Sequence, residues 1–317
     1  MGLSRNKVAV SEVAAGSPPF WRTTSLVYIV FLSKFFVEDF IIFSKISAVE
    51  KEKILMEKPL FSIITPMYKG AALVAATIES VSAQTENNWE MIIVDDCSPD
   101  NGAGAAVVKK YSEKDPRIKL IVSPKNRGSS GARNLAMENA NGRYFAFLDS
   151  DDIWDKDYLE KMKKHIDENK DESVAIYFCG YRRKDSKCEK DLLPPYKCTG
   201  KKDFKKLLFH DPIFPSAAIL DTQKLKEKVA FREELRNLRD DYVYWLDIMK
   251  QGLTAVGYDD ILVDYRMRDD SLTASKKKMI YPQYNIYRNV LKMNFVQSLF
   301  YMFSWAINGA LKYRRMK

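Results

Sequence analysis

Between Leu60 and Leu148 the chain alternates short apolar runs with longer amphipathic stretches, and this alternation constrains the fold more than any other feature of the sequence. Continuous apolar runs are typical of parallel strands that are covered on both faces, and the amphipathic stretches are long enough to form the covering helices. The pattern therefore predicts an α/β fold with a mostly parallel central sheet. We expect strands at 61–65, 89–94, 117–122 and 143–148, and helices at 71–84, from the turn at 97–102 to about 114, and at 129–141. Pro66 is expected to stop the first strand.

Acidic residues follow two of the predicted strands. Asp95 and Asp96 end the second strand, and Asp149, Asp151 and Asp152 follow the fourth. Because ligands of open α/β sheets collect at the carboxyl ends of the strands, both acid groups are candidate binding residues. Two carboxylates spaced Asp-x-Asp in an extended segment point to the same side, so Asp149 and Asp151 could face one divalent cation. A solvated turn after the strand is the alternative interpretation.

The second half of the chain continues the alternation less regularly. We expect a helix at 155–170, a strand at 174–179, a variable loop at 184–202, a short helix at 204–209 and a strand that re-enters the sheet at 213–220. Apolar and aromatic residues at helical spacing then predict a helix over 238–249, with Asp240 and Asp241 at its N-terminus. Acids at this position are either helix caps or functional carboxylates.

The two ends of the chain differ from this pattern. Residues 1–57 contain apolar runs, but Lys34, Glu38 and Asp39 interrupt them, which argues against a membrane-spanning helix and favours a surface helix or a packed extension. Residues 290–317 predict an aromatic-rich helix that closes on a basic tail, as an interfacial membrane helix does; packing on the main domain is the alternative. We divide the chain into an N-terminal extension and linker (1–57), a main domain (58–275) and a C-terminal amphipathic helical segment (276–317).

Composition narrows the possible functions. The formal net charge of +9 indicates an anionic partner. No G-x-G-x-x-G or P-loop motif and no nucleic-acid-binding module occurs, so dinucleotides and nucleic acid are disfavoured as partners. His165 and His210 are isolated, which argues against a histidine-based triad. The cysteines show no C-x-x-C spacing and are interpreted as reduced thiols, at Cys97, Cys179, Cys188 and Cys198.

Six motifs in fixed order resemble those of family 2 glycosyltransferases with the GT-A fold. They are S-I-I-T-P-M-Y at 62–68, I-I-V-D-D-C-S at 92–98, G-A-R-N at 131–134, G-R-Y at 142–144, F-L-D-S-D-D at 147–152 and R-D-D-Y-V-Y-W-L at 239–246. The resemblance covers roughly residues 59–275. It is nearest to bacterial members that build capsule, lipopolysaccharide or teichuronic-acid-like polysaccharides.

The resemblance implies a set of donor-binding residues. Tyr68 would flank the nucleotide base, Asp96 would accept the imide hydrogen of the base, and Asp95 would support the same loop. Arg133 would lie near the nucleotide, where its planar donors suit a pyrophosphate or a structuring carboxylate. The remaining implied donor-binding positions are Pro66, Asp149 and Ser150.

The resemblance also implies a metal site and a catalytic base. Asp149 and Asp151 would hold Mn²⁺ or Mg²⁺, which neutralises the departing diphosphate, and Asp152 would be a neighbour that shares this work. Asp241 would be the general base that deprotonates the acceptor hydroxyl, and Asp240 stands where the family has Glu. Because an ordinary aspartate with a pKa of ~3.9 is a weak base, this role requires desolvation or a hydroxyl held within hydrogen-bond reach.

A weaker part of the resemblance lies at 265–271. Arg266, Arg268 and Ser271 match a late motif whose members often touch the diphosphate. We expect these three residues to support the donor site.

The expected activity is inverting transfer of a sugar from a nucleotide-diphosphate sugar, most often a UDP-sugar, to a lipid-linked or growing saccharide. The expected location is cytoplasmic, peripheral on the inner face of the plasma membrane, with an anionic membrane surface as a partner. A nucleotidyltransferase would share the architecture, but the Gly-rich, Lys/Arg-bearing loop that it needs is missing from residues 66–72. A non-catalytic nucleotide-binding or scaffold protein would not require the full set of acids.

Overall fold

The computed structural model describes residues 58–236, 238–267 and 276–314, with the backbone alone at 276–278 and 309–314. The expectations for residues 1–57 lie outside the described residues, and so do two of the implied site positions, Arg268 and Ser271.

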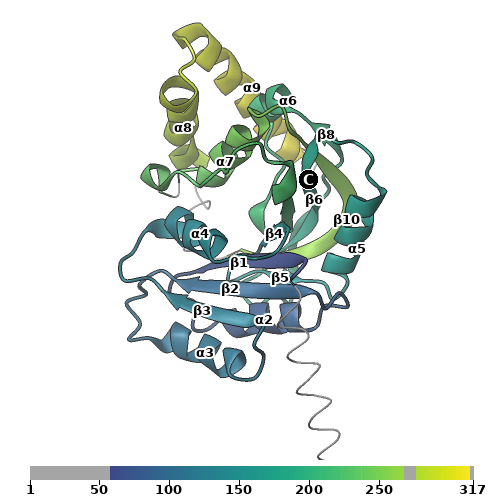
Figure 1. The fold of residues 1–317 in the computed structure, drawn as a ribbon. Helices are drawn as coiled ribbons and strands as arrows, with labels where there is room; N and C mark the ends of the chain where they lie inside the picture. Colours follow the sequence, from purple (N-terminus) through teal and green to yellow (C-terminus); the bar gives the residue numbers. More distant parts are fainter. Residues whose placement is uncertain (1–57, 237, 268–275, 315–317) are drawn as a thin grey trace, which may run out of the picture. The chain divides into compact units, whose positions relative to one another are not determined.

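A mixed β-sheet forms the centre of the described part of the chain (Figure 1). Its strand order is β3-β2-β1-β4-β9-β6-β10-β5, with β7 paired to β6 and β8 paired to β10. The ladders that join β3, β2, β1 and β4 are parallel, whereas β9 is antiparallel to both of its neighbours. The strands are β1 (Phe61–Met67), β2 (Trp89–Asp95), β3 (Ile118–Val122), β4 (Tyr144–Phe147), β5 (Ile153–Trp154), β6 (Val174–Lys184), β7 (Asp191–Tyr196), β8 (Gly200–Lys202), β9 (Ala218–Asp221) and β10 (Thr254–Arg266).

Helices cover both faces of this sheet (Figure 1). Successive side chains of β2 point to opposite faces: Met91 and Ile93 belong to the core beneath α2, α3 and α5, while Ile92 and Val94 belong to the core beneath α4 and α7. Burial on both sides explains why the strands read as continuous apolar runs. The helices are α2 (Val74–Ser82), α3 (Ala103–Ser112), α4 (Gly128–Glu138), α5 (Tyr158–Glu168), α6 (Phe204–Phe209), α7 (Asp240–Met249), α8 (Lys276–Asn285) and α9 (Phe295–Arg314), with a π-helical turn at Ile286–Val290.

The predicted α/β fold is confirmed, and the first four strands and three helices lie close to their expected positions. One boundary is wrong: β1 continues through Pro66 to Met67. The ladder between β1 and β4 ends at the pair Ile64–Phe147, so the missing N–H of Pro66 removes no bond to β4.

The segment 184–202 is not a loop, as the sequence had indicated. Strand β7 pairs antiparallel with an extended β6, and β8 pairs antiparallel with β10. Pro194 and Pro195 made the segment look irregular, but β7 pairs with β6 alone, and proline is tolerated on such an edge strand.

The strand expected at 213–220 is found in its second half as β9, after a 3₁₀ turn at Pro215–Ala217. Strand β9 inserts between β4 and β6.

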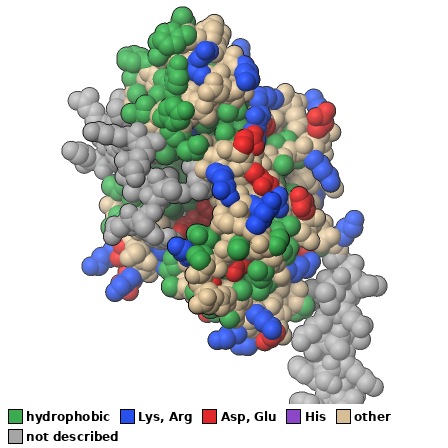
Figure 2. Space-filling model, turned by 90° about the vertical axis from the view of Figure 1, so that its left-hand side faces the viewer, with side chains coloured by type: hydrophobic (Ala, Val, Ile, Leu, Met, Phe, Trp, Pro, Cys, Tyr) green, Lys and Arg blue, Asp and Glu red, His purple; other side chains and the backbone are tan. Residues whose placement is uncertain are grey.

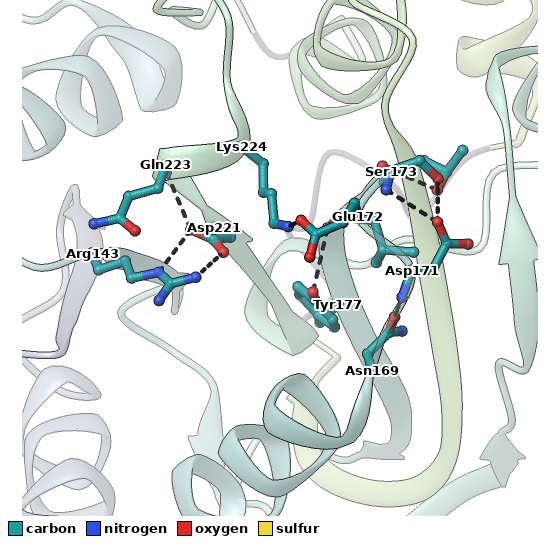
Figure 3. A network of polar contacts seen from close by, with 11 residues as sticks. Arg143, Asn169, Asp171, Glu172, Ser173, Tyr177, Asp221, Gln223 and Lys224 are labelled. Carbon is teal, nitrogen blue, oxygen red and sulfur yellow. Dashed lines mark hydrogen bonds and ion pairs between the residues drawn. The ribbon is translucent and has the colours of Figure 1, made fainter.

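Arg143, which directly precedes β4, forms two hydrogen bonds with the buried carboxylate of Asp221 on β9. They measure 3.1 Å through Nε and 2.7 Å through Nη2 (Figure 3). This ion pair, of which only the Asp221 side is buried, joins β9 to the residue just before β4 in the observed antiparallel register.

The C-terminal helix begins later than predicted. Residue 290 ends the π-helical turn, and α9 starts at Phe295 after Lys292 adopts a positive φ of 57°. Asn294 caps the new helix, because its side-chain oxygen accepts from the backbone N–H of Gln297 at 2.9 Å.

Candidate active site

The loops after β1 and β2 meet at the carboxyl edge of the sheet. Met67 at the end of β1 is in register with Asp95, and the amide of Asp96 donates to the carbonyl oxygen of Met67 at 2.9 Å. Tyr68, the next residue, is 47% exposed. The parallel register therefore brings Pro66, Tyr68 and the first acid pair to one edge, as expected from the sequence.

Asp95 and Asp96 are both buried, and both accept backbone hydrogen bonds. One oxygen of Asp95 accepts from the amide of Ser98 at 3.1 Å. The two oxygens of Asp96 accept from the amides of Arg127 and Gly128, at 2.8 and 2.7 Å, just before helix α4. Burial raises the pKa of Asp96, and these two amides oppose the rise. Each carboxylate oxygen of Asp96 keeps a second lone pair with which it can accept a further donor.

The turn after β4 carries the second acid group and is fastened from two sides. The hydroxyl of Ser216 accepts from the amide of Asp149 at 3.1 Å and donates to Asp152 at 2.5 Å. Arg266, at the end of β10, donates its amide to the other oxygen of Asp152 at 3.1 Å and its Nε to the carbonyl of Asp151 at 2.8 Å. Burial, with the charges of Asp151 and Asp149, raises the pKa of Asp152 well above its usual range. Asp152 is thus the inward anchor of the turn.

Arg133 joins the second acid group to the third. Its guanidinium lies 2.7 Å from Asp149 and 3.4 Å from Asp240, and its side chain is buried. Burial works to lower the pKa of Arg133, but the charges of Asp149 and Asp240 outweigh it and raise the pKa. The sequence led us to expect that Arg133 contacts either a pyrophosphate or a structuring carboxylate. In the described residues it contacts two carboxylates, those of Asp149 and Asp240.

Asp240 and Asp241 lie at the N-terminus of α7, as predicted. The buried carboxylate of Asp240 accepts from the hydroxyl of Ser130 at 2.7 Å, in addition to its contact with Arg133. Asp241 follows Arg239, which has a left-handed backbone (φ 59°), and accepts from the amide of Tyr242 at 2.8 Å. Desolvation, assisted by the charges of Asp240 and Asp211, raises the pKa of Asp241 to about 7.

The role of base that the sequence implied requires Asp241 to be desolvated, and the raised pKa of Asp241 meets this requirement. A carboxylate with a pKa near neutrality is a far better proton acceptor than an ordinary aspartate, because its affinity for a proton is matched to the working pH. The third acid group therefore combines one carboxylate held by Arg133 and Ser130 with one that is poised to take up a proton.

The donor set at the turn suits a hard divalent cation. Asp149 is partly exposed, and one of its oxygens is engaged by Arg133. Mg²⁺ and Mn²⁺ are commonly held by one or two carboxylates together with phosphate oxygens and water, so a site built on Asp149 and Asp151 would need no further protein ligand. Among the described residues no group of three or more His, Cys, Asp or Glu could hold a metal by itself, so substrate oxygens would have to complete the site.

Two residues in these contacts carried no recognisable sequence signal. Ser216 lies in the segment that the sequence predicts as a strand, and Asp211 belongs to no catalytic spacing pattern. Arg239 is part of the R-D-D-Y-V-Y-W-L motif; it donates to Asp211 at 2.8 Å and lies over the ring of Tyr242. Ser216 and Asp211 are distant from the acids in the chain, and only the fold brings them together.

A cavity of about 390 Å³ lies at the opposite, amino-terminal edge of the sheet. Residues that precede β1, β2 and β4 line it, together with Thr222 and Gln223 after the antiparallel β9; these are Lys58, Pro59, Leu60, Asn88, Asn141, Gly142 and Arg143. No acid lines this cavity, and the acid groups described above all lie at the carboxyl edge.

The chain is similar to known proteins in sequence and in fold. A family model described as glycosyl transferase family 2 matches residues 62–225. The chain is 34% identical to a putative teichuronic acid biosynthesis glycosyltransferase, TuaG, of Bacillus subtilis, over 80% of this chain and 98% of that relative. It is 30% identical to the UDP-Glc:alpha-D-GlcNAc-diphosphoundecaprenol beta-1,3-glucosyltransferase WfgD of Escherichia coli, over 81% and 96% of the two chains. Its fold matches the mannosyltransferase PcManGT of Pyrobaculum calidifontis, solved with GDP-Man and Mn²⁺, with a TM-score of 0.58, 16% identity and coverage of 84% of this chain and 80% of that one.

Proposed function

Because the chain belongs to glycosyl transferase family 2, we propose that it is an inverting enzyme of bacterial surface-polysaccharide synthesis. The donor is a nucleotide-diphosphate sugar, and the acceptor is a hydroxyl of a lipid-linked or growing saccharide. The names of TuaG and WfgD support the pathway class, and the name of WfgD supports a UDP-sugar donor and a lipid-diphosphate acceptor.

The donor occupies the carboxyl edge of the parallel strands. Tyr68, which is exposed beside Pro66, offers a face for the base, and Asp96 has a free lone pair for an imide N–H. Asp95 holds the Cys97–Ser98 turn beside it. These contacts orient the nucleotide so that its diphosphate extends toward the turn after β4.

Asp149 and Asp151, with Ser150 between them, would hold Mn²⁺ or Mg²⁺. Such a cation would supply neutralisation of the charge that develops on the leaving diphosphate. Arg266 and the buried Asp152 keep the turn rigid, so that the two carboxylates hold their positions as the charge moves.

Asp241 takes the proton from the acceptor hydroxyl. The observation that carries this role is the desolvated position of its carboxylate at the N-terminus of α7, next to Asp240, which raises its pKa. The hydroxyl oxygen attacks the anomeric carbon from the face opposite the diphosphate while the bond to the diphosphate breaks. The proton passes to Asp241, and the configuration of the anomeric carbon inverts. Asp240 and Arg133 hold the base in place relative to the turn after β4.

The enzyme works peripherally on the inner face of the plasma membrane, where a lipid-linked acceptor and the cytoplasmic donor meet. Among the described residues no helix is both long and apolar enough to cross a bilayer. The amphipathic C-terminal segment supports binding at an anionic membrane surface instead.

The proposal is tested by incubating the protein with Mn²⁺ and a panel of nucleotide sugars, first by thermal shift and then by transfer to diphospholipid-linked sugars. We expect one nucleotide sugar to raise the melting temperature of the protein. We expect the protein to consume this donor rapidly only when the acceptor is present. The anomeric configuration of the product, read by NMR, decides between inversion and retention. A retained configuration would overturn the assignment of Asp241.

A further inference from the structure

Helix α9 carries apolar residues on the side that packs against the protein and also on the side that faces outward. On the inner side, Ser298 is buried, the ring of Tyr301 lies 5.1 Å from that of Phe209, and Asn308 donates to the carbonyl of Phe209 at 3.2 Å. On the outer side, Val296 is 74% exposed and Phe303 is 71% exposed. A helix that is apolar all round is normally buried all round, so the outer side of α9 is expected to have a partner.

Exposed apolar side chains are also found on α8, which contacts α9. At a helical period, residues 296, 299, 300, 303 and 307 fall on one stripe. We name this surface the α8–α9 face; it consists of Ile280, Tyr281, Phe295, Val296, Leu299, Phe300, Phe303 and Ile307. Figure 2 shows hydrophobic side chains gathered at the upper end of the molecule. Large exposed apolar patches mark interaction sites.

The charge of the same part of the chain identifies the partner. Residues 271–317 contain no Asp or Glu and nine basic residues, which equals the whole formal net charge of +9, so the first 270 residues are balanced at 42 and 42. The nine are Lys276, Lys277, Lys278, Arg288, Lys292, Lys312, Arg314, Arg315 and Lys317. An apolar surface in an acid-free, basic segment is complementary to an anionic bilayer, whereas a second copy would bring the same positive charge against it.

We propose that the α8–α9 face is the surface by which this protein docks on an anionic lipid bilayer, with α9 lying in the plane of the interface. The proposal deepens the proposed function and rests on it in one respect: docking presents the site to a lipid-linked acceptor. For residues 290–317 the sequence left membrane binding and packing on the main domain as alternatives. The proposal combines the two, because the inner side of α9 packs on the protein while its outer side is exposed.

The docking surface is attached directly to the third acid group. Gln283 of α8 is buried and accepts a hydrogen bond from Arg239, the residue that precedes Asp240 and Asp241. Tyr287, in the turn between α8 and α9, donates to the carbonyl of Leu208 at 2.8 Å and is also buried. Docking through α8 and α9 therefore sets the height of Asp241 above the lipid headgroups, where the acceptor hydroxyl is presented.

The test measures co-sedimentation of the full chain with vesicles of phosphatidylcholine that do or do not contain about 30% phosphatidylglycerol. The test variant is Val296→Glu/Phe303→Glu, which changes two side chains that are more than two-thirds exposed. The matched control is Ala103→Glu/Ala106→Glu, which adds the same charge on the exposed side of α3, drawn at the other end of the described unit (Figure 1). We expect the test variant to lose at least ~10-fold in partitioning to anionic vesicles, and the control to keep wild-type binding.

Equal binding of wild type and test variant would overturn the proposal, and so would binding that does not depend on the anionic lipid. If instead the wild type self-associates in sedimentation velocity and the test variant does not, a second copy is the occupant of the face. Release of nucleoside diphosphate during transfer to a detergent-solubilised diphospholipid-linked sugar, without vesicles, separates the two proposals. The test variant should keep this transfer. Vesicle binding by a wild-type protein that turns over no donor with this acceptor would refute the proposed function and leave the docking surface standing.

Discussion

The substitution Asp241→Asn should make the protein both inactive and more stable at alkaline pH. The pKa of Asp241 in the fold is about 7, against ~3.9 for an unperturbed aspartate, so the folded state holds this proton more tightly than the unfolded state does. For such a group the stabilising effect of the proton is complete below the unfolded pKa and is lost as the pH rises through about 7. Above that pH the ionised carboxylate opposes folding, and a neutral asparagine relieves this cost.

The size of the effect follows from the shift. Three pKa units at ~1.36 kcal/mol each set an upper limit of about 4 kcal/mol for the gain at alkaline pH. Between about pH 5.5 and about pH 8.5 the advantage of Asn over Asp should grow by about 2 kcal/mol, because only the 1.5 units below the folded pKa contribute. Urea unfolding at the two pH values measures this growth.

The control is Asp259→Asn, an exposed acid whose ion pair with Lys197 spans 3.7 Å. Its effect should be within about 0.5 kcal/mol, as for other substitutions of exposed side chains. In parallel, Asp241→Asn should reduce transfer by at least ~10²-fold while nucleotide-sugar affinity stays unchanged. If Asp241 were only a helix cap, the substitution would cost stability at every pH and would leave transfer largely intact; that pair of results refutes the reasoning.

Three further predictions concern the contacts around the base. Arg133→Met leaves the buried Asp240 and the partly exposed Asp149 without their shared cation, so we expect a loss of about 3–5 kcal/mol in urea unfolding, with Arg133→Lys intermediate. Ser216→Ala removes both hydrogen bonds to the turn after β4 and should cost about 1–3 kcal/mol and raise the Mn²⁺ concentration needed for half-maximal transfer, which a metal titration measures. Asp149→Ala/Asp151→Ala should abolish the dependence of nucleotide-sugar binding on Mn²⁺ or Mg²⁺ in calorimetry; wild-type turnover of this variant in EDTA would contradict the metal assignment.

The sequence could predict the part of the fold from β1 to β4, because the alternation of apolar runs with amphipathic stretches is a local pattern. Strands β1 to β4 are buried on both faces, so their apolar runs stand out against the amphipathic helices between them, and parallel pairing then places every carboxyl end at one edge. For this reason Asp95, Asp96 and the acids from Asp149 onward could be assigned to that edge without coordinates. The alternation was weaker after Asp155, where antiparallel insertions interrupt it.

Edge strands and long-range pairing escaped the same reasoning. Strand β7 is exposed and contains two prolines, and it forms only because the extended β6 supplies a partner. Likewise, the position of Ser216 depends on β9 being inserted between β4 and β6. No local periodicity records which strand a segment will join.

The sequence by itself determined the chemistry that is available: three acid groups, the arginine of G-A-R-N, and a C-terminal segment that holds all of the excess positive charge. The tertiary structure decided how that chemistry is divided. It joined Asp149 and Asp240, which are far apart in the chain, through Arg133. It also raised the pKa of Asp241 by desolvating this carboxylate near the charges of Asp240 and Asp211. The physical reason is that residue types are fixed by the chain, whereas desolvation and charge–charge distances exist only after distant segments have packed together.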